Sequence, residues 1–213
     1  TTIERITLQR SRRGYAILRI ESVLEVGGKT FDSPVRTISV GYHGEEIGNR
    51  TLMQEVGPAE TVVEGKPIPC RVRQYEIESP GQRKSVKVHY SSEVVPHILK
   101  RETRTTLGEG EDPAHLNQLT VTALNRPHPV LDEIKNATHQ KTVKTNGKST
   151  ATTWSVHATD VPGDLVSYRA EEKNKNGKLI RQSTMELIDY GYDAPADAME
   201  DVQQKVRRRS KRR

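Results

Sequence analysis

The sequence predicts a mainly β protein, in which a duplicated antiparallel meander forms a curved open sheet or half-barrel and one helix follows at the C-terminus. Three observations lead to this fold class. Val is the most frequent large apolar residue, apolar and polar residues alternate at period two along several segments, and turn-forming Asn-Gly pairs separate such segments. Ile, Leu, Val and Phe together make up only about a fifth of the chain, which favours thin sheets with one wet face.

The first alternating segment is residues 15–26, where the even positions from Ala16 to Val26 are mostly apolar. This pattern predicts one long strand, or two, with a single buried face. Residues 86–90 and 119–123 alternate in the same way and are expected to be strands. Most of the chain therefore reads as antiparallel meander.

Turn signals connect these strands. Asn146-Gly147 and Asn176-Gly177 are typical of two-residue hairpin turns, because both central positions favour a positive φ angle. Gly27-Gly28 and Ser79-Pro80-Gly81 mark two further turns between alternating runs.

The C-terminus differs from the rest. Residues 194–206 are rich in Ala, Glu, Gln and Met, and Met199, Val202 and Val206 fall on one stripe of an amphipathic helix. Six of the last seven residues are basic, and without them the net charge of +6 falls to zero. We expect residues 207–213 to be a disordered tail, with cations that could bind nucleic acid or anionic lipid: Arg207, Arg208, Arg209, Lys211, Arg212 and Arg213.

Two stretches of the chain resemble each other. Residues 87–99 match residues 154–165, with Pro96 on Pro162 and Leu99 on Leu165, and the match continues to Leu119 on Met185. Each unit reads as a strand, an acidic-Val-Pro corner, a second strand, a loop and a third strand. We therefore expect a single β domain over residues 1–193, built from two related halves at about 1–124 and 125–193.

A family resemblance rests on residues 65–70, 86–96 and 154–163, about an eighth of the chain, which hold a Gly-Lys-x-x-x-Cys strand and two aromatic strands that lead into Val-Pro corners. Their order resembles a class of secreted bacterial β proteins, which in turn resemble the lipoprotein-carrier superfamily. The resemblance implies a strongly curved antiparallel sheet that holds a lipid or acyl chain, and a periplasmic or secreted location, with a cytoplasmic one as the alternative. The sequence departs from such carriers in its few aromatic residues, seven Tyr, one Trp and one Phe.

No catalytic motif emerges from the sequence. The Gly147-Lys148-Ser149-Thr150 stretch lacks the upstream glycine of a phosphate-binding loop and reads as a hairpin. The seven His residues do not form ligand-spaced pairs, so no metal or other cofactor is expected. The single cysteine, Cys70, excludes an internal disulfide and is expected to pack in the core. No apolar run approaches the roughly 18 residues of a membrane-spanning helix.

The sequence therefore predicts a non-enzymatic, extracytoplasmic binding or scaffold protein. An apolar small molecule or lipid would lie on the concave face of the sheet, at Val88, Tyr90, Trp154, Val156 and Tyr168. For Trp154 a core position is favoured over a ligand contact. The alternative is a protein tethered to a polyanion through its basic tail.

Overall fold

The structure is a computed structural model of the whole chain. It describes residues 2–12, 15–27, 29–41, 49–50, 53–79, 81–108 and 114–191. These residues form antiparallel sheets that are not closed, and no helix lies among them, so the mainly β fold class is confirmed. The expected helix at 194–206 and the tail at 207–213 lie outside the described residues.

The chain divides into two compact units, one comprising Thr1–Ile47 with the chain from Ile188 onward, and the other Gly48–Leu187. This division falls elsewhere than the boundary near residue 124 that separates the two expected halves. In the first unit, the long strand β2 pairs with β1 along one edge, and β3 and β4 pair with its two ends. Its strands are β1 (Thr2–Arg12), β2 (Tyr15–Val26), β3 (Lys29–Asp32) and β4 (Arg36–Gly41).

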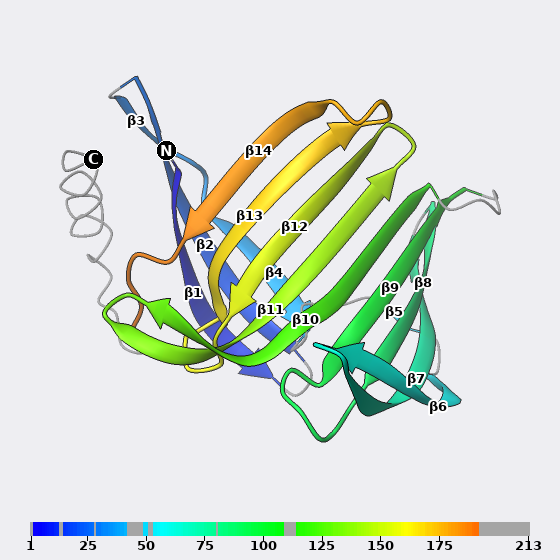
Figure 1. Cartoon of the computed structure of the whole chain (residues 1–213). Coiled ribbons are helices and arrows are strands. Elements are labelled where there is room, and N and C mark those ends of the chain that lie inside the picture. The colour runs from blue at the N-terminus through cyan, green and yellow to red at the C-terminus, as the bar shows by residue number, and fades with distance from the viewer. Residues whose placement is uncertain are drawn as a thin grey trace. The chain divides into compact units, whose positions relative to one another are not determined.

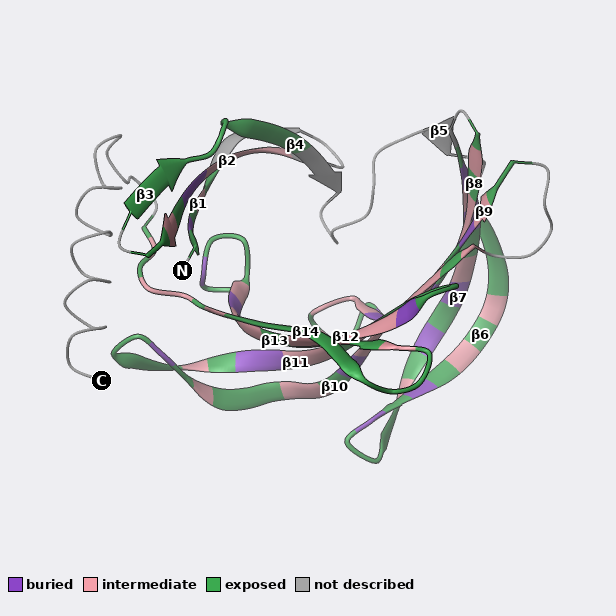
Figure 2. Ribbon diagram, turned by 90° about the horizontal axis from the view of Figure 1, so that it is seen from above, coloured by how far each residue is buried: buried purple, intermediate pink, exposed green. Residues whose placement is uncertain are grey.

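The second unit is one sheet in which each strand from β7 to β14 pairs with the next along the chain (Figure 1). Strands β5 and β6 both pair with β7. Figure 2 shows that this sheet curves strongly, with β7–β9 turned away from the plane of β10–β13. The strands are β5 (Asn49–Arg50), β6 (Gln54–Val63), β7 (Lys66–Ser79), β8 (Gln82–Tyr90), β9 (Ile98–Leu107), β10 (His115–Val130), β11 (Glu133–Asn146), β12 (Ser149–His157), β13 (Leu165–Asn174) and β14 (Leu179–Glu186).

Both Asn-Gly turns expected from the sequence connect neighbouring strands. Between β11 and β12, the carboxamide oxygen of Asn146 accepts hydrogen bonds from the amides of Lys148 and Ser149, each at 2.8 Å. Between β13 and β14, Gly177 has a φ of 78° and donates its amide to the carbonyl of Asn174 at 2.9 Å. Gly fits there because a side chain would be strained at that angle.

The two Val-Pro corners have the same closure. The amide of Ser91 donates to the carbonyl of His97 at 2.8 Å, and the amide of Ala158 donates to that of Asp164 at 2.7 Å. A register shift precedes each corner, so that Tyr90 pairs with Ile98 and His157 pairs with Leu165. Leu165 thus occupies the position of Ile98, and the sequence alignment of Leu165 with Leu99 is one residue off.

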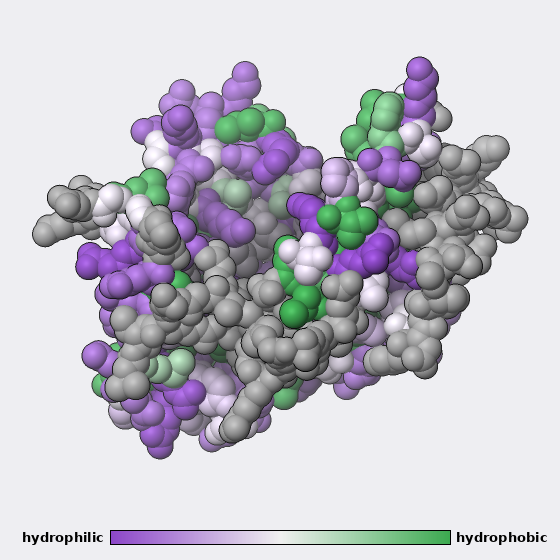
Figure 3. All heavy atoms as spheres, turned by 180° about the vertical axis from the view of Figure 1, so that it is seen from behind, coloured by the Kyte–Doolittle hydropathy of each residue, from purple (hydrophilic) through white to green (hydrophobic). Residues whose placement is uncertain are grey.

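Eight of the buried side chains of the second unit form two small clusters. One contains Val63, Cys70, Leu99 and Val121, and the other contains Tyr75, Ile77, Val86 and Val88. The expected core position of Cys70 is confirmed, since the residue is only 5% exposed. Figure 3 shows that on one side of the molecule the hydrophobic residues stand in small groups among hydrophilic ones, as expected of a chain with few large apolar residues.

Candidate functional site

The pairing registers assign each side chain of the second unit to one of two sheet faces, because residues directly opposite each other in an antiparallel pair point to the same side. Lys87 lies opposite Gln74 and Glu102, and these define what we call the Lys87 face. Its neighbour Val86 lies opposite Tyr75 and points to the other side, the Val86 face.

The five residues expected to hold an apolar ligand are divided between the two faces. Val88, Tyr90 and Tyr168 lie on the Val86 face, whereas Trp154 and Val156 lie on the Lys87 face. Val88 is buried in the second core cluster, with 4% of its surface exposed. Tyr90 lies under the guanidinium of Arg73, 4.4 Å from the ring centroid, which is the geometry of a cation–π contact. The structure therefore does not bring these five side chains together.

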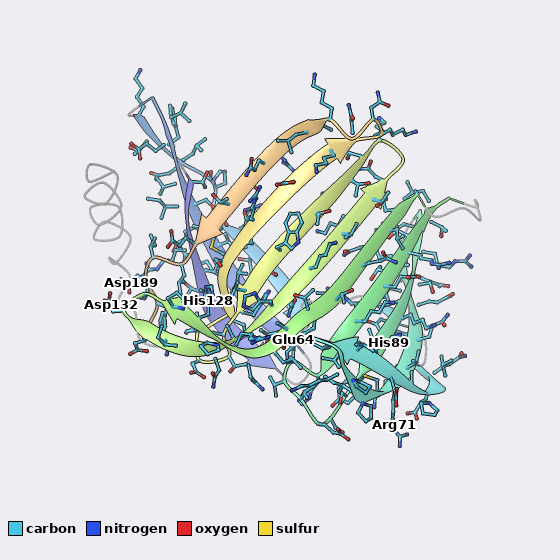
Figure 4. The ribbon with its side chains drawn as sticks, viewed as in Figure 1. Glu64, Arg71, His89, His128, Asp132 and Asp189 are labelled. Atoms are coloured by element: carbon cyan, nitrogen blue, oxygen red, sulfur yellow. The ribbon has the colours of Figure 1, made fainter. Side chains whose placement is uncertain are left out.

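A polar hollow of about 350 Å³ opens on the Lys87 face of β7, β8 and β9. All of its lining residues carry hydrogen-bonding or charged side chains, and the registers place all of them on the same face. They are Gln74, Ser85, Lys87, His89, Lys100, Glu102 and Arg104. Figure 4 labels His89 within this part of the sheet.

The single carboxylate in the lining is already neutralised. Glu102 accepts a hydrogen bond from Gln118 at 3.0 Å and forms an ion pair with Arg104 at 2.8 Å. The bond from Gln118, and then that from Arg104, holds the pKa of Glu102 below its usual range. By contrast, among the residues that the structure describes, Lys87 and Lys100 form no salt bridge. The hollow therefore has a surplus of positive charge.

His89 lies beside these two lysines. Burial, and then the charges of Lys100 and Lys87, hold its pKa below the ordinary value of a histidine. Its Nδ1 atom lies 3.0 Å from the Oγ1 atom of Thr61 on β6. Cys70 donates its thiol toward the same Thr61 oxygen at 3.5 Å and toward the carbonyl of Ile68 at 3.4 Å. His89 is thus held in place and is a neutral side chain that could accept a proton when an anion approaches.

A second hollow, of about 340 Å³, lies between the β10–β11 hairpin and the edge formed by β13 and β14. It has more apolar walls, and its lining comprises His128, Pro129, Val130, Leu131, Val166, Ser167, Thr184, Met185, Glu186 and Leu187. Met185 lies directly opposite Tyr168, and Ser167 lies directly opposite Val156, so two of the five expected ligand residues are next to this hollow.

Sequence reasoning missed the residues of the polar hollow, although a signal for them was present. Residues 85–89 and 100–104 place a polar side chain at every second position, and two neighbouring strands of this kind give one polar sheet face. What the sequence did not contain was the register, which decides whether the two polar sets share a face.

Within the described ranges, no group of three His, Cys, Asp or Glu side chains could hold a metal ion. No helix in that part of the chain has the length and apolar character needed to cross a membrane. No family model, no curated protein and no solved structure matches the chain.

Proposed function

We propose that the protein is a non-enzymatic binding protein that holds a small anionic ligand in the polar hollow of the Lys87 face. The observation that carries the proposal is the pair Lys87 and Lys100, two lysines without salt bridges among the described residues, next to a carboxylate that other groups neutralise. A lysine ammonium is a compact point charge that suits phosphate or carboxylate oxygens. Ser85 and Gln74 add neutral hydrogen-bonding groups around the same space.

An anion fits this hollow better than the apolar ligand expected from the sequence. Apolar ligands are held by hydrophobic and aromatic linings, and every lining residue of the polar hollow has a polar side chain. The second hollow, with Val130, Val166 and Met185 in its walls, is the better place for an apolar molecule. A lipid carried by this protein would therefore bind there, away from Lys87.

The proposal assigns no chemical step to the hollow. The one thiol of the chain, Cys70, is buried, and its sulfur is engaged with Thr61 and Ile68. Buried cysteines of this kind are packing residues, because an activated thiolate needs partial exposure and a positive environment. A location outside the cytoplasm is part of the proposal and rests on the family resemblance of the sequence alone.

Duplication of the strand–corner–strand unit also remains a proposal. The matched closures at Ser91 and Ala158 support it, as do the matched register shifts at Tyr90 and His157. In the third strand of each unit, Leu119 pairs with Arg101, three residues after Ile98, and Met185 pairs with Tyr168, three residues after Leu165. The second and third strands therefore pair in the same register in both units.

The alternative function, polyanion tethering through residues 207–213, lies outside the described residues. Its six cations would give affinity that falls steeply with salt and does not depend on sequence. A full-length variant with these six residues changed to Gln separates the tail from the hollow, because it keeps Lys87 and Lys100.

Calorimetric titration of the full-length protein with inorganic pyrophosphate tests the proposal. Lys87→Ala and Lys100→Ala should each weaken binding roughly tenfold, because each removes a charge-assisted hydrogen bond. Lys148→Ala is the matched control, since this exposed lysine lies in the β11–β12 turn and outside the hollow. Equal affinities of the double variant Lys87→Ala/Lys100→Ala and the unaltered protein would overturn the proposal. So would the complete absence of binding.

A further inference from the structure

The only tryptophan of the chain stands on the Lys87 face between two cations. Trp154 on β12 lies directly opposite Lys141 on β11 and directly opposite Arg169 on β13. It is 42% exposed, so a large part of the indole faces solvent. Lys141 and Arg169 are exposed as well. An accessible aromatic side chain with a positive neighbour on each side is thus built into the sheet.

The same row of side chains continues to the polar hollow. Lys141 lies opposite Thr120, Thr120 opposite Lys100, and Lys100 opposite His89. Six neighbouring strands, β8 to β13, each contribute one residue to this row. With neighbouring strands roughly 4.8 Å apart, the row from His89 to Arg169 spans about 24 Å. The hollow is therefore one end of a longer line on the same sheet face.

The cations of the row are regularly placed. Lys100, Lys141 and Arg169 stand on alternate strands, β9, β11 and β13. The guanidinium of Arg169 forms a salt bridge with the carboxylate of Glu171, with an N–O distance of 2.5 Å. Lys100 and Lys141 take part in no salt bridge within the described ranges. Two positions of the row thus offer uncompensated charge, and Trp154 lies immediately beyond the second of them.

We propose that this row, from His89 to Arg169, is a track for a single-stranded nucleic acid. This inference rests on the proposed function, because the track begins in the anion-binding hollow. Phosphates would lie over Lys100 and Lys141, and one base would stack on the indole of Trp154. Cations that follow a backbone, together with an exposed aromatic ring that stacks a base, are the two components of sequence-independent single-strand binding. With a single aromatic residue on the track, binding depends mainly on charge.

The test uses a fluorescein-labelled deoxythymidine oligomer of about 16 nucleotides, a length at the upper end of single-strand site sizes. Every protein is full-length with the six tail cations changed to Gln, so that the tail contributes nothing. Lys141→Ala should weaken binding several-fold and lower the slope of log affinity against log salt by about 0.7, the value for one phosphate contact on a single strand. Trp154→Ala should weaken binding roughly tenfold, and Trp154→Phe should retain most of the affinity, because a phenyl ring still stacks.

Lys144→Ala is the matched control. Lys144 lies on the same strand as Lys141 but points to the Val86 face, where Ala151 is its cross-strand partner. Its substitution removes the same charge and should leave binding of the oligomer unchanged. If Lys141→Ala and Lys144→Ala weaken binding equally, the attraction is unspecific and the track is overturned.

Pyrophosphate titration of the same variants separates the two proposals. Lys141→Ala and Trp154→Ala should leave pyrophosphate binding unchanged, since neither residue lines the hollow. Pyrophosphate binding without oligomer binding overturns the track and leaves the proposed function standing. If the oligomer fails to bind and heparin binds in a manner that depends on Trp154, the row is a site for acidic polysaccharide and the inference is wrong.

Discussion

Thr61 on β6 and His89 on β8 touch through Oγ1 and Nδ1 at 3.0 Å, although β7 lies between their strands in the sheet. Two strands that are not neighbours can come this close only where the sheet curls toward the face that both side chains share. Here that face is the Lys87 face. The contact fixes the orientation of the one histidine that lines the polar hollow.

Ligand affinity should increase as the pH falls, because an anion in the hollow favours the protonated form of His89. Burial and the two lysines keep the pKa of His89 low in the free protein, and a bound anion raises it. We expect methanedisulfonate, whose charge is constant in this range, to bind several-fold more tightly at pH 5.5 than at pH 7.5. Calorimetry of His89→Gln should show this gain abolished; an undiminished gain would exclude His89 as its source.

The protein should become less stable on mild acidification. Burial lowers the pKa of His157 below its ordinary value, and His89 and His139 are lowered in the same direction. Between the ordinary value of about 6.5 and the lowered one, the unfolded chain binds more protons than the folded protein. The stability that these histidines contribute is therefore fully present above the pKa of the unfolded chain, and it is lost as the pH falls through the lower pKa of the folded protein. Urea midpoints from pH 8 to pH 5 should fall less in His157→Asn than in the unaltered protein.

Leu99 should be among the most sensitive core positions. Its side chain is fully buried, with 0% exposure, in the cluster with Val63 and Cys70. Leu99→Ala should lower the free energy of unfolding by about 2–5 kcal/mol, since it removes buried methyl groups and leaves a cavity. Leu107 on the same strand is 52% exposed, and Leu107→Ala should change stability by about 0.5 kcal/mol or less. Similar losses in the two variants would contradict the described packing.

Trp154→Ala should cost little stability. Truncation of a core tryptophan to alanine lowers the free energy of unfolding by about 3–5 kcal/mol. Truncation of a half-exposed side chain on a sheet face removes mainly cross-strand contacts, which lowers the free energy of unfolding by about 1 kcal/mol or less. Urea unfolding followed by circular dichroism measures the difference. A loss above about 3 kcal/mol would assign the indole to the core rather than to a surface site.

Much of the sheet was predictable because its signals are local. Alternation identified strands such as residues 86–90, and the Asn146-Gly147 and Asn176-Gly177 pairs identified where hairpin turns lie, although of these four residues only Gly177 has the expected positive φ. The same reasoning assigned the apolar even positions of residues 15–26 to a buried face. In the structure, Leu24 and Val26 on that face are 40% and 57% exposed. Alternation shows that a strand has two unlike faces, but what covers a face depends on elements elsewhere in the chain.

The candidate site was less predictable for the same reason. Trp154 and Tyr168 are both aromatic and lie on neighbouring strands, yet the register puts them on opposite faces. Lys87 and Lys100 are ordinary surface lysines in the sequence, and they form a candidate site only because the β8–β9 register places them on one face beside a neutralised Glu102. Register is a property of strand pairs and cannot be read from one strand.

The most direct test of the anion-binding hollow is a nuclear magnetic resonance titration of the full-length protein with inorganic pyrophosphate, in which the histidine ring signals are followed. The account predicts that the ring signals of His89 shift on binding and that the pKa of His89 rises, while the signals of His128 and His157, outside the hollow, stay in place. Saturable binding that leaves the His89 signals and pKa unchanged would contradict it.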